Sequence, residues 1–269
     1  FIDKFYVANV ADLKIIESTV NFGARSFSYS APSGFKALCT TNLPDPTIAD
    51  GSTAFEAKTY TGNSSTQTIS LPFSPDLVWV KGRNNAYDHE LATTVQPLNK
   101  ALASNITDPE FNTVIEPGTN GFFLDGQSDY ANAGGINYVS WNWDAGTSTV
   151  SNTDGSITSS VRANPSAGFS IVSYTGTGSA GTVGHGLNAD MGMVITKTRE
   201  SSNGWIVWHS SFSNLTSNYL QLNLTDAVGT LSNYWGSGGV TNSVIGLGTY
   251  TGNNTNGEGM IAYCFAPVE

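Results

Sequence analysis

The three histidines of the chain are the first side chains to consider for catalysis. Asp88-His89-Glu90 could support acid–base chemistry, and His209-Ser210-Ser211 could pair a nucleophile with its base. His185 lies between two glycines, as in a turn. Neither a G-x-S-x-G nor an H-E-x-x-H pattern accompanies these residues. We therefore expect histidines that form hydrogen bonds or lie exposed, and no enzymatic activity.

Acidic and amide side chains gather in residues 116–132. A glycosidase needs two carboxyl groups about 5–10 Å apart, which Glu116 with Asp125 or Asp129 could provide, although no motif supports this. Asp125, Asp129 and Asn132 also carry the oxygens that Ca²⁺ prefers, so they are weak metal candidates. Their spacing is not that of a calcium-binding loop. Thr249–Asn256, which occupies the same place in the repeat described below, contains no acid. We expect turn chemistry here, with no metal ion and no cofactor.

Aromatic residues offer a better binding candidate. Tyr234 and Trp235 lie in the Gly- and Ser-rich stretch 232–242, where large rings are hard to bury and where recognition loops are often built. Trp205 and Trp208 are an odd number of residues apart, so on a strand they should face opposite sides, and one of them could be exposed. We expect Tyr234, Trp235 and Trp205 to form the ligand-binding residues.

The elements that would hold these residues occur twice. Phe55–Trp143, the first copy, and Phe169–Phe265, the second copy, show the same features in the same order. Tyr60-Thr61-Gly62 recurs as Tyr174-Thr175-Gly176 at an offset of 114 residues (174 − 60), and the last strand recurs at an offset of 122 (265 − 143). The period is too long for a solenoid. We interpret the repeat as two similar β-domains in tandem.

The last strand of each copy alternates hydrophobic residues. Val139, Trp141 and Trp143 would share one strand face. The second copy fills the same positions with Ile261, Tyr263 and Phe265. Matched hydrophobic positions are typical of a core, so we expect a core face here in preference to a sugar-stacking surface.

Two pairs of basic residues also recur. Lys81 and Arg83 match Lys197 and Arg199 at an offset of 116 (199 − 83). Residues spaced by two lie on one face of a strand. We expect these residues to form a salt bridge or an inter-domain contact.

Short, regularly spaced strands with turn clusters favour an all-β fold. We predict two tandem, similar, antiparallel β-sandwich domains of jelly-roll-like type with a short N-terminal arm. The predicted boundaries are 1–39 for the arm, 40–53 for a linker, 54–149 for the first domain, 150–163 for a second linker and 164–269 for the second domain.

The composition excludes several classes of partner. The chain has 21 acidic and 11 basic residues, and its charged residues amount to 12%. Without a basic patch it should bind neither nucleic acid nor an anionic membrane surface. No apolar run approaches the roughly 20 residues of a membrane span, so we expect no membrane insertion.

Two parts of the sequence carry a family resemblance. Asn21–Tyr29, followed by Gly34–Cys39 and Asn42-Leu43-Pro44, resembles the last strand and exit segment of SPRY-like domains in phage and marine-virus virion proteins. The remainder resembles the duplicated β-domain of uncharacterised function that follows SPRY-like domains in tailed-phage tail and fibre proteins. Residues 1–20 depart from a complete SPRY domain, so 1–39 would be an arm or a remnant of one.

The resemblance implies a structural virion protein of a tailed bacteriophage, a tail fibre or appendage module that contributes to host attachment. A capsid decoration or head-appendage protein and a stand-alone carbohydrate-binding module are the alternatives. The implied partners are other virion proteins, further copies of the chain with a trimer favoured, and a host surface glycan. The expected location is the virion, assembled in the host cytoplasm.

Overall fold

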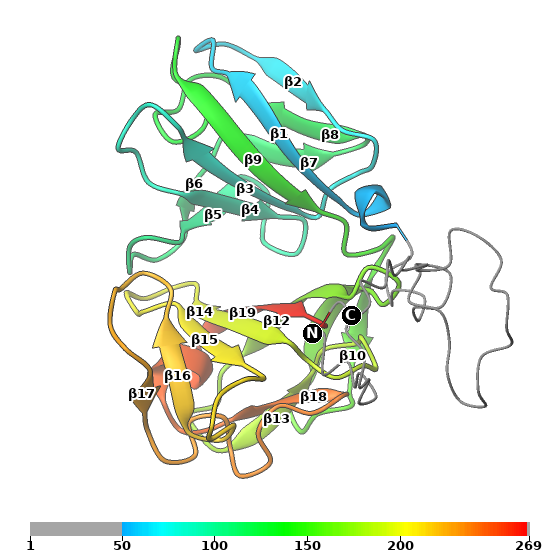
Figure 1. Ribbon diagram of the computed structural model, residues 1–269, viewed down its shortest axis with the longest axis vertical. Helices are drawn as coiled ribbons and strands as arrows, with labels where there is room; N and C mark the ends of the chain where they lie inside the picture. Colours follow the sequence, from blue (N-terminus) through cyan, green and yellow to red (C-terminus); the bar gives the residue numbers. More distant parts are fainter. Residues whose placement is uncertain (1–49, 268–269) are drawn as a thin grey trace, which may run out of the picture. The chain divides into compact units, whose positions relative to one another are not determined.

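The computed structural model describes residues 50–267, so the predicted arm 1–39 and most of the linker 40–53 lie outside the described residues (Figure 1). Almost all regular structure in this range is β-strand. None of its helical segments has both the length and the hydrophobicity that a membrane crossing requires.

The first copy contains two antiparallel sheets. The larger has the order β1-β9-β3-β4-β5-β6, and the smaller has the order β2-β8-β7. A single 3₁₀ turn, Gly51–Thr53, precedes β1. The larger sheet comprises β1 (Phe55–Thr61), β9 (Asn137–Trp143), β3 (Leu77–Gly82), β4 (Glu90–Thr93), β5 (Lys100–Ala103) and β6 (Phe111–Asn112). The smaller sheet comprises β2 (Gln67–Ser70), β8 (Gly121–Leu124) and β7 (Ile115–Gly118).

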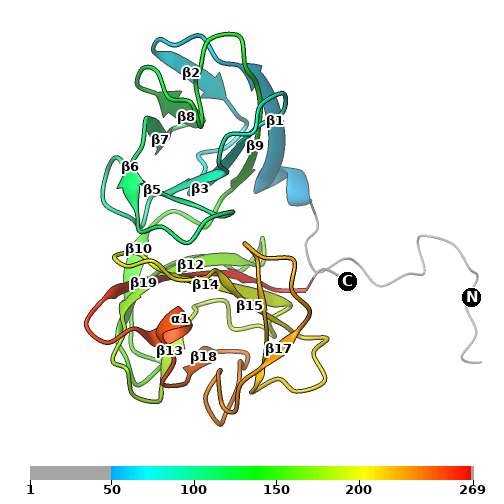
Figure 2. The ribbon, with the colours of Figure 1, turned by 90° about the vertical axis from the view of Figure 1, so that its left-hand side faces the viewer.

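The second copy has two more strands in its larger sheet and one fewer in its smaller one. Its larger sheet has the order β10-β11-β12-β19-β14-β15-β16-β17, and a β13-β18 ribbon lies beneath that sheet in Figure 2. The larger sheet comprises β10 (Thr149–Asn152), β11 (Ser159–Asn164), β12 (Phe169–Thr175), β19 (Gly259–Phe265), β14 (Met193–Thr198), β15 (Ile206–His209), β16 (Asn218–Gln221) and β17 (Gly229–Thr230). The ribbon comprises β13 (Gly181–Gly184) and β18 (Val244–Leu247), and the short helix α1 spans Thr251–Asn254.

The order of the strands in the two larger sheets reflects the duplication. From β12 to β17 the second copy has the order β12-β19-β14-β15-β16-β17, which matches β1-β9-β3-β4-β5-β6 strand for strand. The predicted all-β, sandwich-like fold is therefore confirmed. Both copies belong to one compact unit of the chain, and the domain boundaries within it stay predictions.

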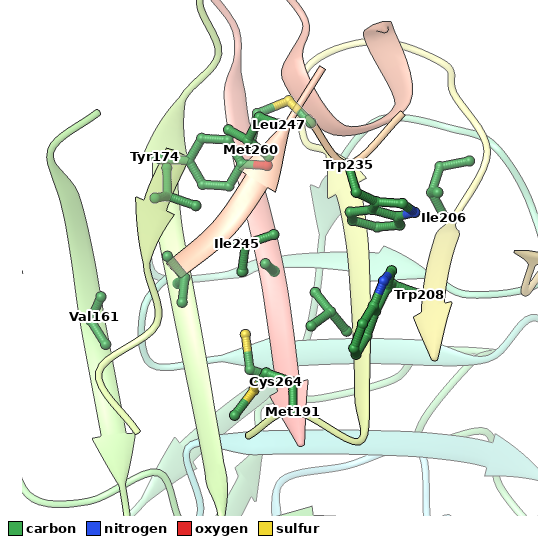
Figure 3. Packing of buried hydrophobic residues seen from close by; sticks show 14 of the residues in the cluster. Val161, Tyr174, Met191, Ile206, Trp208, Trp235, Ile245, Leu247, Met260 and Cys264 are labelled. Carbon is green, nitrogen blue, oxygen red and sulfur yellow. The ribbon is translucent and has the colours of Figure 1, made fainter. Parts of the chain in front are cut away.

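Three hydrophobic clusters hold the two copies. One fills the first copy and includes Val78, Val80 and Phe122. A second fills the second copy, where residues from β12, β18 and β19 converge (Figure 3). The third joins the outer faces of the two larger sheets, because it combines Leu77, Leu91 and Leu102 of the first copy with Phe169, Ile171, Ile195, Trp205, Val207, Ile261 and Tyr263 of the second. The larger sheet of the second copy is therefore buried on both faces.

The interiors of the two copies differ in polarity. Glu90, Ser140 and Asn142 are fully buried in the first copy. The second copy has apolar residues at the equivalent positions, namely Ile206, Ala262 and Cys264. The first copy thus has buried polar groups at positions where the second copy has apolar ones, and such groups are costly unless they find partners.

Candidate functional site

An apolar cleft lies where the start of the first strand and the end of the last strand of each copy meet. Its volume is about 510 Å³. The first copy lines it with Gly51, Ser52, Ala54, Phe55 and Trp143, and the second copy lines it with Ala167, Gly168, Phe169, Phe265 and Ala266. A cleft of this size and apolar lining is the usual form of a ligand site.

The cleft is built from equivalent residues of the two copies. Phe55 pairs with Trp143 across β1 and β9, and Phe169 pairs with Phe265 at the same register of β12 and β19. The ring centroids are 4.9 Å apart in the first pair and 5.0 Å apart in the second. Trp143 bridges the copies, with its ring 5.9 Å from that of Phe169 and 6.1 Å from that of Phe265. Tilted contacts at these distances are favourable for aromatic rings.

The same turn leads into the cleft in both copies. The Ala54 N–H donates to the Gly51 carbonyl at 3.1 Å, and the Gly168 N–H donates to the Pro165 carbonyl at 3.3 Å. In the first copy the Asp50 carboxylate also accepts the Ser52 N–H, as Asp side chains commonly do at such turns. Gly168 has a φ of +65°, a conformation that glycine adopts without strain. These turns fix the positions at which Phe55 and Phe169 enter their sheets.

A buried ion pair supports the cleft from behind Trp143. The Asp76 N–H donates to the Trp143 carbonyl at 2.7 Å, and the Asp76 carboxylate accepts the Ala145 N–H at 2.8 Å. The same carboxylate forms an ion pair with Arg162 on β11. Burial raises the pKa of Asp76, and the neighbouring hydrogen bonds and Arg162 oppose that shift. Asp76 thus links the first copy to the strand that leads into the second.

The lining of the cleft is apolar and uncharged among residues 50–267. None of the described residues that line it has a titratable side chain. Phe55 is 38% exposed, whereas Phe169 is 1% exposed and forms the floor. Exposed aromatic faces stack on apolar or ring-shaped ligands, and a serine and backbone groups at the rim can provide hydrogen bonds.

The expected aromatic loop is not a surface feature. Tyr234 and Trp235 are 3% and 0% exposed, so the expectation that they are exposed for ligand binding is wrong. The Tyr234 ring stacks between those of Tyr219 and Tyr250, at 4.9 and 5.1 Å. The Trp235 Nε1–H donates to the Asn218 carbonyl at 2.9 Å, and its ring lies in the core of the second copy (Figure 3). A Gly-rich stretch buries these rings because its glycines let the backbone fold closely over β18.

Trp205 and Trp208 lie on opposite faces, as predicted, but neither is exposed. Trp205 belongs to the cluster between the copies, and Trp208 belongs to the core of the second copy. The Trp205 Nε1–H donates to the carbonyls of Ala103 and Ile106 in the first copy, at 2.9 and 3.1 Å. Trp205 is therefore an interface residue, because the sheet that carries it is covered on both sides.

The weak metal candidates do not form a site. Within residues 50–267 no group of three or more His, Cys, Asp or Glu side chains is arranged to hold a metal ion. Asp125 and Asp129 are exposed, whereas Asn132 is fully buried. The Asn132 amide donates to the carbonyls of Ser65 and Gly126, at 2.7 and 2.6 Å, and its oxygen accepts hydrogen bonds from two further groups. Its polar atoms are thus occupied within the chain.

The same arrangement recurs in the second copy. The Asn254 amide donates to the carbonyls of Ser179 and Gly248, both at 2.7 Å. Its oxygen accepts the Thr177 N–H at 2.7 Å. Because Asn132 and Asn254 are equivalent at an offset of 122 (254 − 132), each is a structural residue that ties three loops of its copy together.

The rings of His185 and His209 form hydrogen bonds, as predicted. The His209 Nδ1 lies 2.7 Å from the Ser211 hydroxyl, but it also accepts the Ser211 N–H, and both residues are exposed. His185 is buried, with its Nε2 3.3 Å from the Thr241 carbonyl, and burial lowers its pKa. Burial also lowers the pKa of His89, and nearby Lys81 adds to that effect. The His209–Ser211 contact is a turn contact between near neighbours.

The buried face of strand β9 is the opposite of the face predicted to form the core. Tyr138, Ser140 and Asn142 are buried inside the first copy. The alternate face, with Val139, Trp141 and Trp143, is only partly buried. The equivalent face of β19 is buried against the first copy, which is why hydrophobic residues match at these positions without forming the core of either sandwich.

The recurring basic residues have different roles. Arg199 forms a bidentate pair with Glu110 of the first copy, at 2.8 and 2.9 Å, which confirms the predicted inter-domain contact. Lys197 is fully buried, donates to the carbonyls of Thr198 and Ser201, and has its pKa lowered by burial to about 8. Arg83 has no ion-pair partner among residues 50–267.

The sequence reasoning did not select the cleft residues. A signal was present, because aromatic residues begin and end both copies: Phe55, Trp143, Phe169 and Phe265. What the sequence did not reveal is that these ends come together across the two copies.

One known protein family matches most of the chain. The family model for a domain of unknown function, DUF7483, matches residues 50–269. Searches of curated proteins and of solved structures returned no match. The matched range includes both copies, the cleft and the turn before β1. The chain belongs to the DUF7483 family.

Proposed function

We propose that this chain is a structural virion protein of a tailed bacteriophage, a tail fibre or appendage module that contributes to host attachment through the aromatic cleft. The resemblance to phage virion proteins supports the setting. The cleft is the observation that carries the binding role, because Phe55 and Trp143 meet Phe169 and Phe265 in an apolar lining without titratable side chains. Such a lining suits recognition rather than catalysis.

The ligand class that suits this role is a host surface glycan. Pyranose rings present a flat apolar face that stacks on exposed aromatic side chains, and Phe55 offers the most exposed ring of the cleft. Gly51 and Ser52 line the cleft, and the Ser52 hydroxyl oxygen, whose hydrogen is donated to Asp50, can accept a hydrogen bond from a sugar hydroxyl. This proposal moves the carbohydrate site from Tyr234 and Trp235 to the cleft.

A test of the setting compares two surfaces. Fluorescently labelled protein is incubated with intact host cells and, in parallel, with virions stripped of their appendages. Saturable cell binding that host glycan competes away supports an attachment module. Binding to virions alone supports the alternative, a capsid decoration or head-appendage protein. Binding to neither surface would contradict both.

A further inference from the structure

The loop between β5 and β6, residues 104–110, docks the first copy onto the second. Glu110 pairs with Arg199 through both carboxylate oxygens, and the Glu110 N–H donates to the Arg199 carbonyl at 2.7 Å. The Asn203 N–H donates to the Thr107 carbonyl at 2.9 Å. The first copy also offers the carbonyls of Ala103 and Ile106 to the Trp205 Nε1–H, so the backbone shape of the loop contributes to this contact beside the Glu110 side chain.

The second copy holds an equivalent loop, residues 222–228, of the same length and conformation. The Ser104 N–H donates to the His89 carbonyl at 2.9 Å, and the Leu222 N–H donates to the Trp205 carbonyl at the same distance. Asn105 accepts the His89 N–H at 2.8 Å, and Asn223 accepts the Trp205 N–H at 2.9 Å. The second loop therefore leaves its strand with the same hydrogen bonds as the loop that docks in the first copy.

This second loop is exposed and unusually apolar. Leu222, Leu224 and Val228 are 39%, 47% and 47% exposed. Of the eight large hydrophobic side chains that are exposed in residues 50–267, five lie in residues 215–231. Val228 stands where Glu110 stands in the first loop, at an offset of 118 (228 − 110). Grouped exposed apolar residues of this kind mark interaction sites.

The surface that would receive this loop is open in the first copy. The receiving loop of the second copy, residues 199–205, corresponds to residues 83–89 at an offset of 116. Arg83 is exposed and occupies the position of Arg199, and His89 occupies the position of Trp205 with one ring N–H that can donate. Among residues 50–267, the docking loop 222–228 and the receiving loop 83–89 form hydrogen bonds only within their own copies.

We propose that residues 222–228 of one chain dock onto residues 83–89 of a second copy of the same chain, in the manner that residues 104–110 dock onto residues 199–205 within the chain. This assigns the interface of the oligomer that the proposed function implies. The two surfaces differ, so the contact is heterologous. Repeated contacts close into a ring or continue as a filament, according to the rotation that relates one chain to the next.

The test measures association of the whole chain by sedimentation velocity across a concentration series. Wild-type protein is expected to self-associate in the micromolar range, roughly Kd 1–100 µM. Changing Leu222→Asp together with Leu224→Asp is expected to weaken association at least tenfold, because charges replace the apolar contact. Leu98→Asp, at a position that is 80% exposed outside either loop, is the matched control and should leave association unchanged.

Two further variants probe the geometry. Val228→Glu places an acid where Glu110 stands, so it should pair with Arg83 of the neighbour and tighten association about tenfold, and adding Arg83→Glu should abolish that gain. Because wild-type Val228 offers Arg83 no acidic partner, Arg83→Glu alone should change association much less than Leu222→Asp/Leu224→Asp does.

Monomeric wild-type protein at about 100 µM would overturn the interface. Association that none of the loop variants alters would overturn it as well. A protein that self-associates through these loops but binds neither cells nor virions would support the proposed interface and contradict the proposed function. Failure of the interface can therefore be told apart from failure of the function.

Discussion

The carboxyl group of Glu90 should make the stability of the protein depend on pH in an unusual direction. Glu90 is fully buried in the first copy, between Val80 on β3 and Ala103 on β5. Neither of its carboxylate oxygens has a hydrogen-bond partner. Burial raises the pKa of Glu90 to about 7, from an ordinary value of 4.5, and the Thr113 hydroxyl opposes the shift only in part.

The sign and size of the effect follow from linkage. Between pH 4.5 and about 7 the folded protein keeps a proton on Glu90 that the unfolded chain has lost, so stability falls as the pH rises through this window. A shift of about 2.5 pKa units corresponds to about 3 kcal/mol at 1.36 kcal/mol per unit. The stabilising contribution is complete below pH 4.5 and is lost above pH 7.

Glu90→Gln removes the titration while keeping nearly the same volume. Urea unfolding at about pH 5 and pH 8 should show that wild-type protein loses about 2.5 kcal/mol more free energy of unfolding across this interval than the variant loses, because part of the contribution is already lost at pH 5. Taking the difference between the two proteins cancels the contributions of His89 and His185, whose pKa values are lowered. Equal pH dependence in both proteins would refute the reasoning. Glu90→Ile, which copies Ile206, should be more stable than wild type at pH 8.

Two further predictions concern structural contacts. Asn132→Ala removes hydrogen bonds to Ser65 and Gly126 and leaves buried backbone groups without partners. Urea titrations should show a free energy of unfolding that is lower by about 3 kcal/mol or more. Asn254→Ala should have the same effect. A loss below about 1 kcal/mol would contradict the assigned role. Glu110→Gln breaks the bidentate pair with Arg199 between the copies, and about 2–4 kcal/mol should be lost in thermal unfolding because Arg199 is left partly buried and unpaired. An unchanged melting temperature would contradict it.

The sequence predicted the repeat better than it predicted the exposure of single residues. Offsets between Tyr60 and Tyr174 located equivalent strands, because a duplicated fold keeps its strand order. The period-two rule placed Trp205 and Trp208 on opposite faces correctly. It did not reveal that both faces are covered, since the outer cover of that sheet comes from the other copy, far away in sequence.

The polarity of the sequence gave wrong predictions of burial at two aromatic sites, the loop with Tyr234 and Trp235 and the strand β9. The glycines around Tyr234 and Trp235 suggested an exposed loop, yet they let the backbone pack closely against β18. A Cβ added at Gly236, whose φ is +65°, would lie 3.2 Å from the Leu247 carbonyl oxygen. On β9 the hydrophobic face with Trp141 looked like the core, but the buried face is the one with Ser140. Local pattern does not determine which face a second domain will cover.

Host-cell binding by cleft variants tests the central claim most directly. Phe55→Ser removes the most exposed ring of the cleft, and Leu98→Ser is a matched control, a similar change at a more exposed site away from the cleft. Circular dichroism and thermal unfolding first establish that both variants fold. The proposed role predicts that Phe55→Ser weakens saturable binding to host cells at least tenfold and that Leu98→Ser binds as wild type does. Full cell binding by a folded Phe55→Ser variant would contradict the claim that the cleft is the attachment site.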